Sequence, residues 1–252
     1  MRLFWSLLFV LAPFASVAEE VVLGLSKDKV AITTSFDGSE ILIFGAVKRE
    51  TQIPEGAPLE VVITVTGPSH PVTVRRKSKV FGIWVNTDAV EVDRAPSFYA
   101  VATTAPLSDV LSETEDLRHK VTIDRAIRSV GAPDTIDNAA SFTDAVIRIR
   151  RDADLYQTLE NAVALDQQTL FRTAIEMPAN LTEGDYATRI FLTRDGKGVS
   201  SYETFIAVQK VGLERWLFIL SRQQPFWYGI LSLAIAIAAG WMASAVFSLF
   251  RR

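Results

Sequence analysis

The sequence predicts a mainly β protein of the α+β class: an immunoglobulin-like β-sandwich with a helical insertion, followed by one C-terminal transmembrane helix. Short β-rich segments alternate with turn residues about every ten residues, which is typical of a sandwich. Helix-start signals interrupt that pattern within residues 106–152. No charged residue occurs from Gln223 to Phe250, a run long enough to cross a bilayer.

The first 18 residues have the pattern of a secretory signal peptide. Arg2 precedes an apolar run over residues 3–12, and Ser16 and Ala18 are the small residues expected before a cleavage site. As a helix the run would span roughly 15 Å, against roughly 30 Å of bilayer core. We therefore expect residues 1–18 to direct export; an uncleaved signal anchor is the alternative.

Residues 19–105 are predicted to form the first half of the sandwich. Residues 40–47 and 59–66 are rich in β-forming residues and are bounded by turns that contain glycine or proline. Three further short strands follow, of which the first two are joined by a basic turn: 71–75, 79–85 and 97–103.

The helical insertion is predicted over residues 106–152. Ser112-x-x-Glu115 is a capping box, and helix-forming residues continue from it to about Val130. A second helix is expected from Ser141 to about Arg151. Residues 153–210 then complete the sandwich with strands at 169–177, 185–194 and 200–209.

Two apolar segments end the chain. Residues 211–224 place Leu213, Trp216, Leu217 and Leu220 at helical spacing, which predicts an amphipathic helix on the membrane surface, or alternatively one packed on the outer domain. Residues 225–250 are predicted to cross the membrane, and 251–252 form a short tail. The interface anchors are aromatic or basic: Trp216, Trp227, Tyr228, Arg251 and Arg252.

The export signal sets the expected topology, because the basic residues on the two sides of the span do not. The chain is already translocating when the second apolar run stops it, so residues 19–224 are expected in the periplasm and the C-terminus in the cytoplasm. We expect a single-pass protein of the bacterial inner membrane, with the lipid bilayer as one partner.

Small residues recur every four positions along the predicted span. Such a stripe lets two membrane helices approach closely, which predicts a contact with a second copy or with another envelope membrane protein. The alternative is that small residues are simply common in membrane helices. The stripe consists of Ser232, Ala236, Gly240, Ser244 and Ser248.

The composition and motifs do not indicate an enzyme. The chain has no cysteine, two histidines and a net charge of −3, and it lacks a nucleophile elbow, a phosphate loop and a dinucleotide fingerprint. We therefore predict no catalytic residue, no metal ligand and no cofactor. Residues 19–222 contain all the acidic residues, and an acidic domain is a poor partner for nucleic acid.

The most distinctive stretch lies at 80–86 and 96–99. Trp84 and Tyr99 are expected on adjacent strands, where they could form an aromatic face for a ligand or partner; packing in the sandwich core is the alternative.

A family resemblance rests on Gly82-Ile-Trp-Val-Asn86, Pro96-Ser-Phe-Tyr99, Lys210-Val-Gly-Leu-Glu214 and Gly240-Trp241. On these residues the chain resembles a family of alphaproteobacterial transmembrane proteins with a periplasmic domain and one C-terminal transmembrane helix. That family has no established activity, so it implies no catalytic residue. Members of that family are often encoded beside a sulfite-exporter-like transporter, which implies an accessory role for this chain.

Three functions are therefore weighed. The first is a non-enzymatic interaction module displayed on the inner membrane. The second is an accessory or solute-binding subunit of a membrane transporter. The third is a periplasmic enzyme, which the small set of acid and base residues disfavours.

Overall fold

The computed structural model describes most of the chain outside its two ends. The predicted signal peptide and the two terminal arginines lie outside this part. The described ranges are 19–26, 29–32, 38–49, 53, 56–129, 138–210 and 213–250.

Sheet A contains four antiparallel strands in the order β1-β3-β10-β9. Its central strands alternate buried and exposed residues, because one face packs inward and the other faces water. The strands are β1 (Glu20–Leu25), β3 (Ser39–Lys48), β9 (Ala164–Asp166) and β10 (Leu170–Met177).

Sheet B contains six strands in the order β2-β12-β11-β4-β7-β8. The pairs β2/β12 and β7/β8 are parallel, and the others are antiparallel. The strands β4 and β7 are buried on both faces, since a layer packs on each side of them. The strands are β2 (Lys29–Ile32), β4 (Glu60–Thr66), β7 (Tyr99–Thr103), β8 (Tyr156–Leu159), β11 (Gly184–Arg194) and β12 (Lys197–Lys210).

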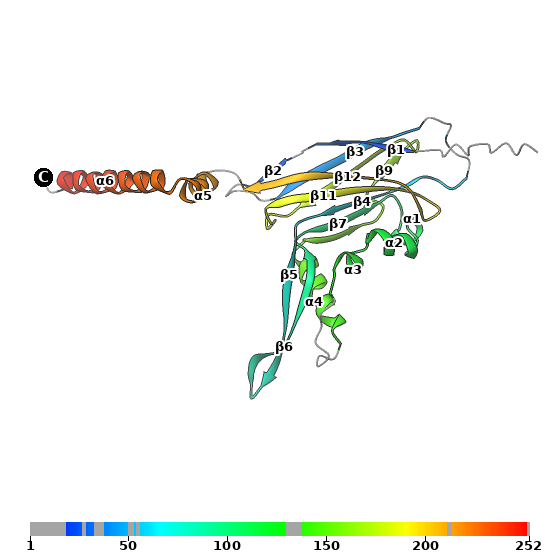
Figure 1. Ribbon diagram of the computed structural model, residues 1–252, viewed down its shortest axis with the longest axis horizontal. Helices are drawn as coiled ribbons and strands as arrows, with labels where there is room; N and C mark the ends of the chain where they lie inside the picture. Colours follow the sequence, from blue (N-terminus) through cyan, green and yellow to red (C-terminus); the bar gives the residue numbers. More distant parts are fainter. Residues whose placement is uncertain are drawn as a thin grey trace, which may run out of the picture.

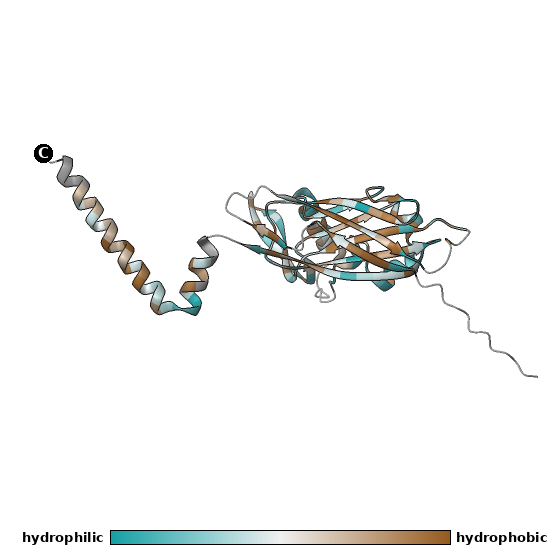
Figure 2. Cartoon of the chain, turned by 90° about the horizontal axis from the view of Figure 1, so that it is seen from above, coloured by the Kyte–Doolittle hydropathy of each residue, from teal (hydrophilic) through white to brown (hydrophobic). Residues whose placement is uncertain are grey.

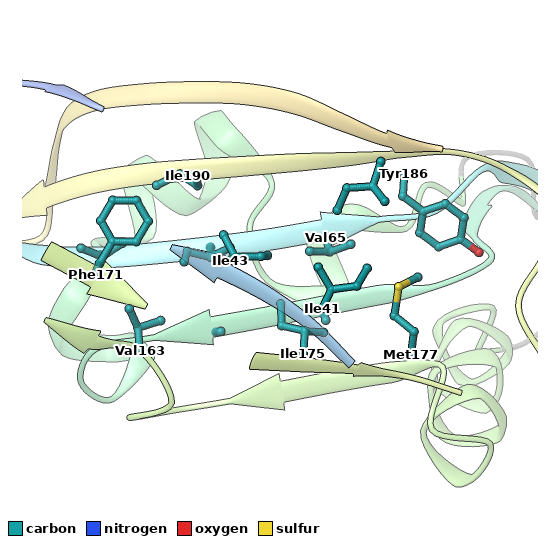
Figure 3. Packing of buried hydrophobic residues seen from close by; sticks show 14 of the residues in the cluster. Ile41, Ile43, Val65, Val163, Phe171, Ile175, Met177, Tyr186 and Ile190 are labelled. Atoms are coloured by element: carbon teal, nitrogen blue, oxygen red, sulfur yellow. The ribbon is translucent and has the colours of Figure 1, made fainter. Parts of the chain in front are cut away.

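Sheets A and B pack face to face over one hydrophobic core, and together they are called the two-sheet body (Figure 1). Ile43 of β3 and Phe171 of β10 face Val65 and Ile190 of sheet B (Figure 3). Each such side chain, fully removed from water, stabilises the fold by roughly 1.5–3 kcal/mol. The predicted mainly β architecture is confirmed, whereas its immunoglobulin-like detail stays a prediction.

The other face of sheet B carries four described helices and the base of a long hairpin, and three of these helices contribute to a second core together with the hairpin base. All four helices fall within residues 106–152, where helix was expected. They are α1 (Leu107–Val110), α2 (Glu113–His119), α3 (Ile123–Ala126) and α4 (Ala140–Asp152).

The predicted continuous helix from Ser112 to about Val130 is wrong. Ser112 caps α2 by accepting a hydrogen bond from the Glu115 amide, which is one half of the predicted capping box, while its own amide donates to the Gly196 carbonyl instead of the Glu115 side chain. The helix then ends at Lys120, whose φ of 52° is left-handed. The Asp116 carboxylate accepts hydrogen bonds from the amides of Val121 and Thr122, which satisfies the chain where it leaves helical geometry.

A hairpin of β5 (Ser69–Val80) and β6 (Ile83–Pro96) projects from the body (Figure 1). The two short strands with a basic turn between them, predicted at 71–75 and 79–85, are therefore wrong. Residues 75–79 continue β5, and the turn lies at Phe81 and Gly82.

Two helices end the chain: α5 (Leu213–Gln223) and α6 (Pro225–Phe250). Within α6, residues Pro225–Ala245 are long and apolar enough to cross a membrane, and none of this stretch is buried within the protein. Figure 2 shows hydrophobic residues along this helix. The exposure of an apolar helix on all sides is expected for a segment that lipid surrounds.

Candidate functional site

The tip of the hairpin is a two-residue turn with an unusual occupant. Phe81 and Gly82 have φ angles of 48° and 86°, which is the left-handed pattern of a tight primed turn. Asparagine, aspartate or glycine normally takes the first position, and a bulky residue there stores roughly 1–3 kcal/mol of strain. The Phe81 ring is also wholly exposed. Folding alone does not explain a strained and solvated phenylalanine.

Exposed apolar side chains surround this turn. Ile83 and Trp84 are 68% and 66% exposed, and their neighbours on both strands are also exposed. A contiguous exposed apolar patch marks an interaction site on a soluble surface. We call this patch the apolar apex and define it as Val80, Phe81, Ile83, Trp84 and Val85.

Cations follow directly behind the apolar apex on β5. Lys79 pairs in register with Trp84, so the ammonium group and the indole ring share one face of the hairpin. Within the described residues, Lys77 and Lys79 form no ion pair. Residues 71–87 contain no acidic residue. We call the cations Arg75, Arg76, Lys77 and Lys79 the basic segment.

Packing against α4 holds the base of the hairpin. Val72 and Val74 of β5 pack against the second core, in which Val92 of β6 is fully buried. Arg76 donates a 2.8 Å hydrogen bond to Ser141 Oγ, and its guanidinium lies 4.5 Å from the centre of the Phe142 ring. The hairpin is therefore fixed up to Arg76, and residues 77–87 extend beyond this support with mostly exposed side chains.

The predicted interface anchors that the structure describes lie on the surface of α5 and α6. Trp216 of α5 is exposed, and so are Trp227 and Tyr228 in the first turn of α6. Arg251 and Arg252 lie outside the described residues. Of the small-residue stripe, Ser232, Ala236, Gly240 and Ser244 are exposed, while the side chain of Ser248 lies outside the description.

Comparison with known protein families decides the classification. The family model described as "Putative transmembrane protein (Alph_Pro_TM)" matches residues 20–249. The chain belongs to this family. The match runs from β1 into the last turn of α6, so Alph_Pro_TM includes both the two-sheet body and the membrane helix. Among curated proteins, none matches this chain.

This member of Alph_Pro_TM does not combine Trp84 and Tyr99 in one face, which corrects the sequence-based prediction. Trp84 lies at the apolar apex, whereas Tyr99 is 1% exposed in the second core. Roughly 40 Å of extended strand separates Trp84 from the hairpin base next to Tyr99. Trp84 and Tyr99 lie on consecutive strands, as predicted. Their separation in the sequence does not reveal that the first of these strands is long and projects from the body.

Tyr99 has a structural role. Its hydroxyl donates a 2.8 Å hydrogen bond to the Val121 carbonyl, which ties β7 to the segment after α2. Burial raises the pKa of Tyr99 to about 12, so the phenol stays neutral. A buried, neutral and hydrogen-bonded tyrosine is not available to a partner.

A basic hollow of about 520 Å³ lies between sheet B and the helices, and two of the cations that line it, Arg125 and Arg189, make structural contacts. Arg125 forms 2.8 Å ion pairs with Glu113 and Asp116. Arg189 donates a 2.8 Å hydrogen bond to the His119 carbonyl. These contacts hold the short helices on sheet B. Arg125 and Arg189 therefore have structural roles.

The two histidines and the carboxylates of the described part of the chain do not gather into a metal site. Within that part, no three histidine, aspartate or glutamate side chains gather where they could hold a metal ion. His119 lies 3.3 Å from a carboxylate oxygen of Glu115 and packs against the ring of Phe191, as a side chain that joins α2 to sheet B. The apolar apex with its basic segment remains the candidate functional site.

Proposed function

We propose that this chain is a single-pass protein of the bacterial inner membrane that displays its two-sheet body in the periplasm as a non-enzymatic interaction module. The apolar apex is its contact surface. The observation that carries the proposal is the combination at one turn of a left-handed, fully exposed Phe81 with exposed Trp84 and Ile83.

Physical chemistry supports a binding role for this turn. Exposed aromatic rings are unfavourable in water, and each could release roughly 1.5–3 kcal/mol on full burial against a target. The backbone strain at Phe81 also raises the free energy of the unbound hairpin. A rigid base, fixed by the valine core and by Arg76, keeps the apex extended and reduces the entropy lost on docking.

Cysteine labelling tests both topology and docking, because the chain contains no natural cysteine. We would compare Val80→Cys at the apex with Ser201→Cys on the exposed face of β12. In intact spheroplasts, an impermeant maleimide should label Ser201→Cys, since the body lies outside. Val80→Cys should be labelled several-fold more slowly in native membranes, and the difference should vanish in denaturant.

Two outcomes would contradict the proposal. If Ser201→Cys is labelled only after lysis, the body does not lie in the periplasm. If both cysteines react at equal rates in native membranes, the apex is not docked.

A second candidate function, the accessory subunit of a membrane transporter, is favoured by the small-residue stripe of α6. An added Cβ at Gly240 would meet no atom within 4 Å, so the surface of α6 at this position is free for a neighbouring helix to approach. Purification of the chain in mild detergent distinguishes this function, because a transporter subunit should co-purify with a second membrane protein in fixed ratio.

A further inference from the structure

The hairpin leaves the body at the end where the chain continues toward the membrane. Strand β4 ends at Thr66, two residues before Pro68 and the base of β5. At the same end, Gly184 of β11 pairs with Val208 near the end of β12. A Cβ on Gly184 would lie 2.4 Å from Pro68 Cγ, so the hairpin base and the end of β12 are neighbours. Figure 1 shows the hairpin departing from this end and running across the direction of α6, so the apex reaches the membrane that α6 crosses when the body tilts relative to α6.

The order of side chains along the hairpin matches the layers of a membrane surface. The apolar ring of Phe81 is outermost, Trp84 and Lys79 follow, and Lys77 lies next along β5. At about 3.3 Å per residue, Lys79 and Lys77 lie roughly 7 and 13 Å behind Phe81. With Phe81 at the acyl boundary, Trp84 and Lys79 reach the headgroup layer, which tryptophan and cations prefer.

The hairpin tip is positively charged, so it favours an anionic membrane surface over a neutral one. Asp88 lies 3.8 Å from Arg76 and leaves Lys77 and Lys79 unneutralised among the described residues. A lysine near an anionic leaflet contributes about a five-fold gain in membrane partitioning. The two lysines reinforce the insertion of the aromatic residues, as two weak membrane signals together give stable attachment.

The shape of the apex favours lipid over a folded protein. Stable protein interfaces bury about 800 Å² on each partner and have a broad, shaped core. The apex is a turn between two strands about 5 Å apart, which is narrow and convex. A fluid interface accepts such a wedge without a matching pocket, and α6 already places a bilayer next to the chain.

We infer that the apolar apex inserts into the anionic phospholipid surface of the same membrane that α6 crosses, with Lys77 and Lys79 of the basic segment at the headgroups. This inference rests on the proposed function and names the target of its contact surface. The body is then held at two points, α6 and the hairpin, and its orientation on the membrane is fixed.

The experiment uses the full chain with Val80→Cys carrying an environment-sensitive fluorophore. The protein is reconstituted into vesicles of phosphatidylcholine alone, or with one third phosphatidylglycerol. In anionic vesicles the emission should shift to the blue and lipids brominated on their acyl chains should quench it. Ser201→Cys with the same fluorophore is the matched control and should show neither change.

Variants separate the apolar and the electrostatic contributions. In the labelled Val80→Cys chain, Lys77→Gln with Lys79→Gln should lower the ratio of inserted to free apex about 25-fold, and 0.5 M salt should act in the same direction. Phe81→Ser with Trp84→Ser should abolish insertion. Far-ultraviolet circular dichroism checks that the body stays folded.

The outcomes distinguish the two proposals. An apex that stays in water in anionic vesicles but is protected from maleimide in native membranes overturns lipid insertion and points to a protein partner, while the proposed function stands. An apex that is exposed in both settings overturns both. Insertion that is equal in neutral and anionic vesicles overturns the role assigned to the basic segment.

Discussion

Phe171 of β10 lies directly over Gly45 of β3, its partner in the sheet A register. A Cβ on Gly45 would stand 2.5 Å from Cζ of that ring and 2.7 Å from the carbonyl oxygen of Val22. Both distances are far below contact distance. The close approach of Phe171 to the backbone of β3 therefore requires glycine at position 45.

Gly45→Ala should destabilise the body by about 1–3 kcal/mol, because the Phe171 ring is buried and the Val22 carbonyl belongs to the sheet ladder, so neither can move freely. Thermal unfolding of the full chain in mild detergent measures the loss. Gly24→Ala is the matched control: the atoms nearest its Cβ would all belong to the Phe44 ring, which is 44% exposed and can swing away. Equal losses for the two variants would show that the buried ring is not the cause.

Asp116 is the buried acceptor that ends α2. Its carboxylate accepts hydrogen bonds from two amides, from the Thr122 hydroxyl and from the Arg125 guanidinium, at 2.8–3.0 Å. Asp116→Ala should lower the free energy of unfolding by about 3 kcal/mol, since it leaves buried donors without a partner. Glu113→Ala, which removes an exposed carboxylate from the same Arg125, should cost about 0.5 kcal/mol or less. Urea unfolding compares the two; similar losses would contradict the assigned role.

Glu19 makes stability depend on acid pH. Burial alone would raise the pKa of its carboxyl group, but hydrogen bonds and positive charge from Arg194 and Arg49 outweigh burial and lower the pKa below its usual 4.5. A lowered folded-state pKa contributes stability above the unfolded pKa, and this contribution is lost as pH falls through the folded value. Wild-type stability should therefore drop below about pH 4.5.

Glu19→Gln should show a smaller drop over the same pH range, because glutamine has no proton to gain. Glu20→Gln is the neighbouring control: Glu20 is exposed and pairs with Lys48 at 3.5 Å, so its replacement should leave the acid profile unchanged. Urea unfolding at pH 7, 4 and 3 provides the comparison. Parallel profiles for wild type and Glu19→Gln would refute the prediction.

The stripe of small residues in α6 predicts that a large side chain weakens helix association when it is placed on the stripe, and not when it is placed on the opposite face. Gly240→Ile should weaken association of the helix, with itself or with a partner, in a bacterial membrane two-hybrid assay. Ala238→Ile, on the opposite side of the same helix, should leave the signal unchanged. If both variants behave alike, the stripe is not the contact.

Sequence by itself determined the elements whose signals are local. The β-forming residues of β3, β10 and β11, the Ser112 cap and the uncharged run of α6 all report on neighbours within a few residues, and the structure places each where expected. The membrane helix was the clearest, because the thickness of a bilayer sets its length.

Only the tertiary structure decided what depends on distant partners. The break after α2 follows from Asp116 and its bonds to Val121 and Thr122, which no propensity predicts. The predicted turn between residues 75 and 79 is strand, because the strand period carries no information about where a hairpin leaves its support. Tyr99 is buried in the second core whereas Trp84 is exposed at the hairpin tip, since burial depends on which layers pack around each strand and not on the residue alone.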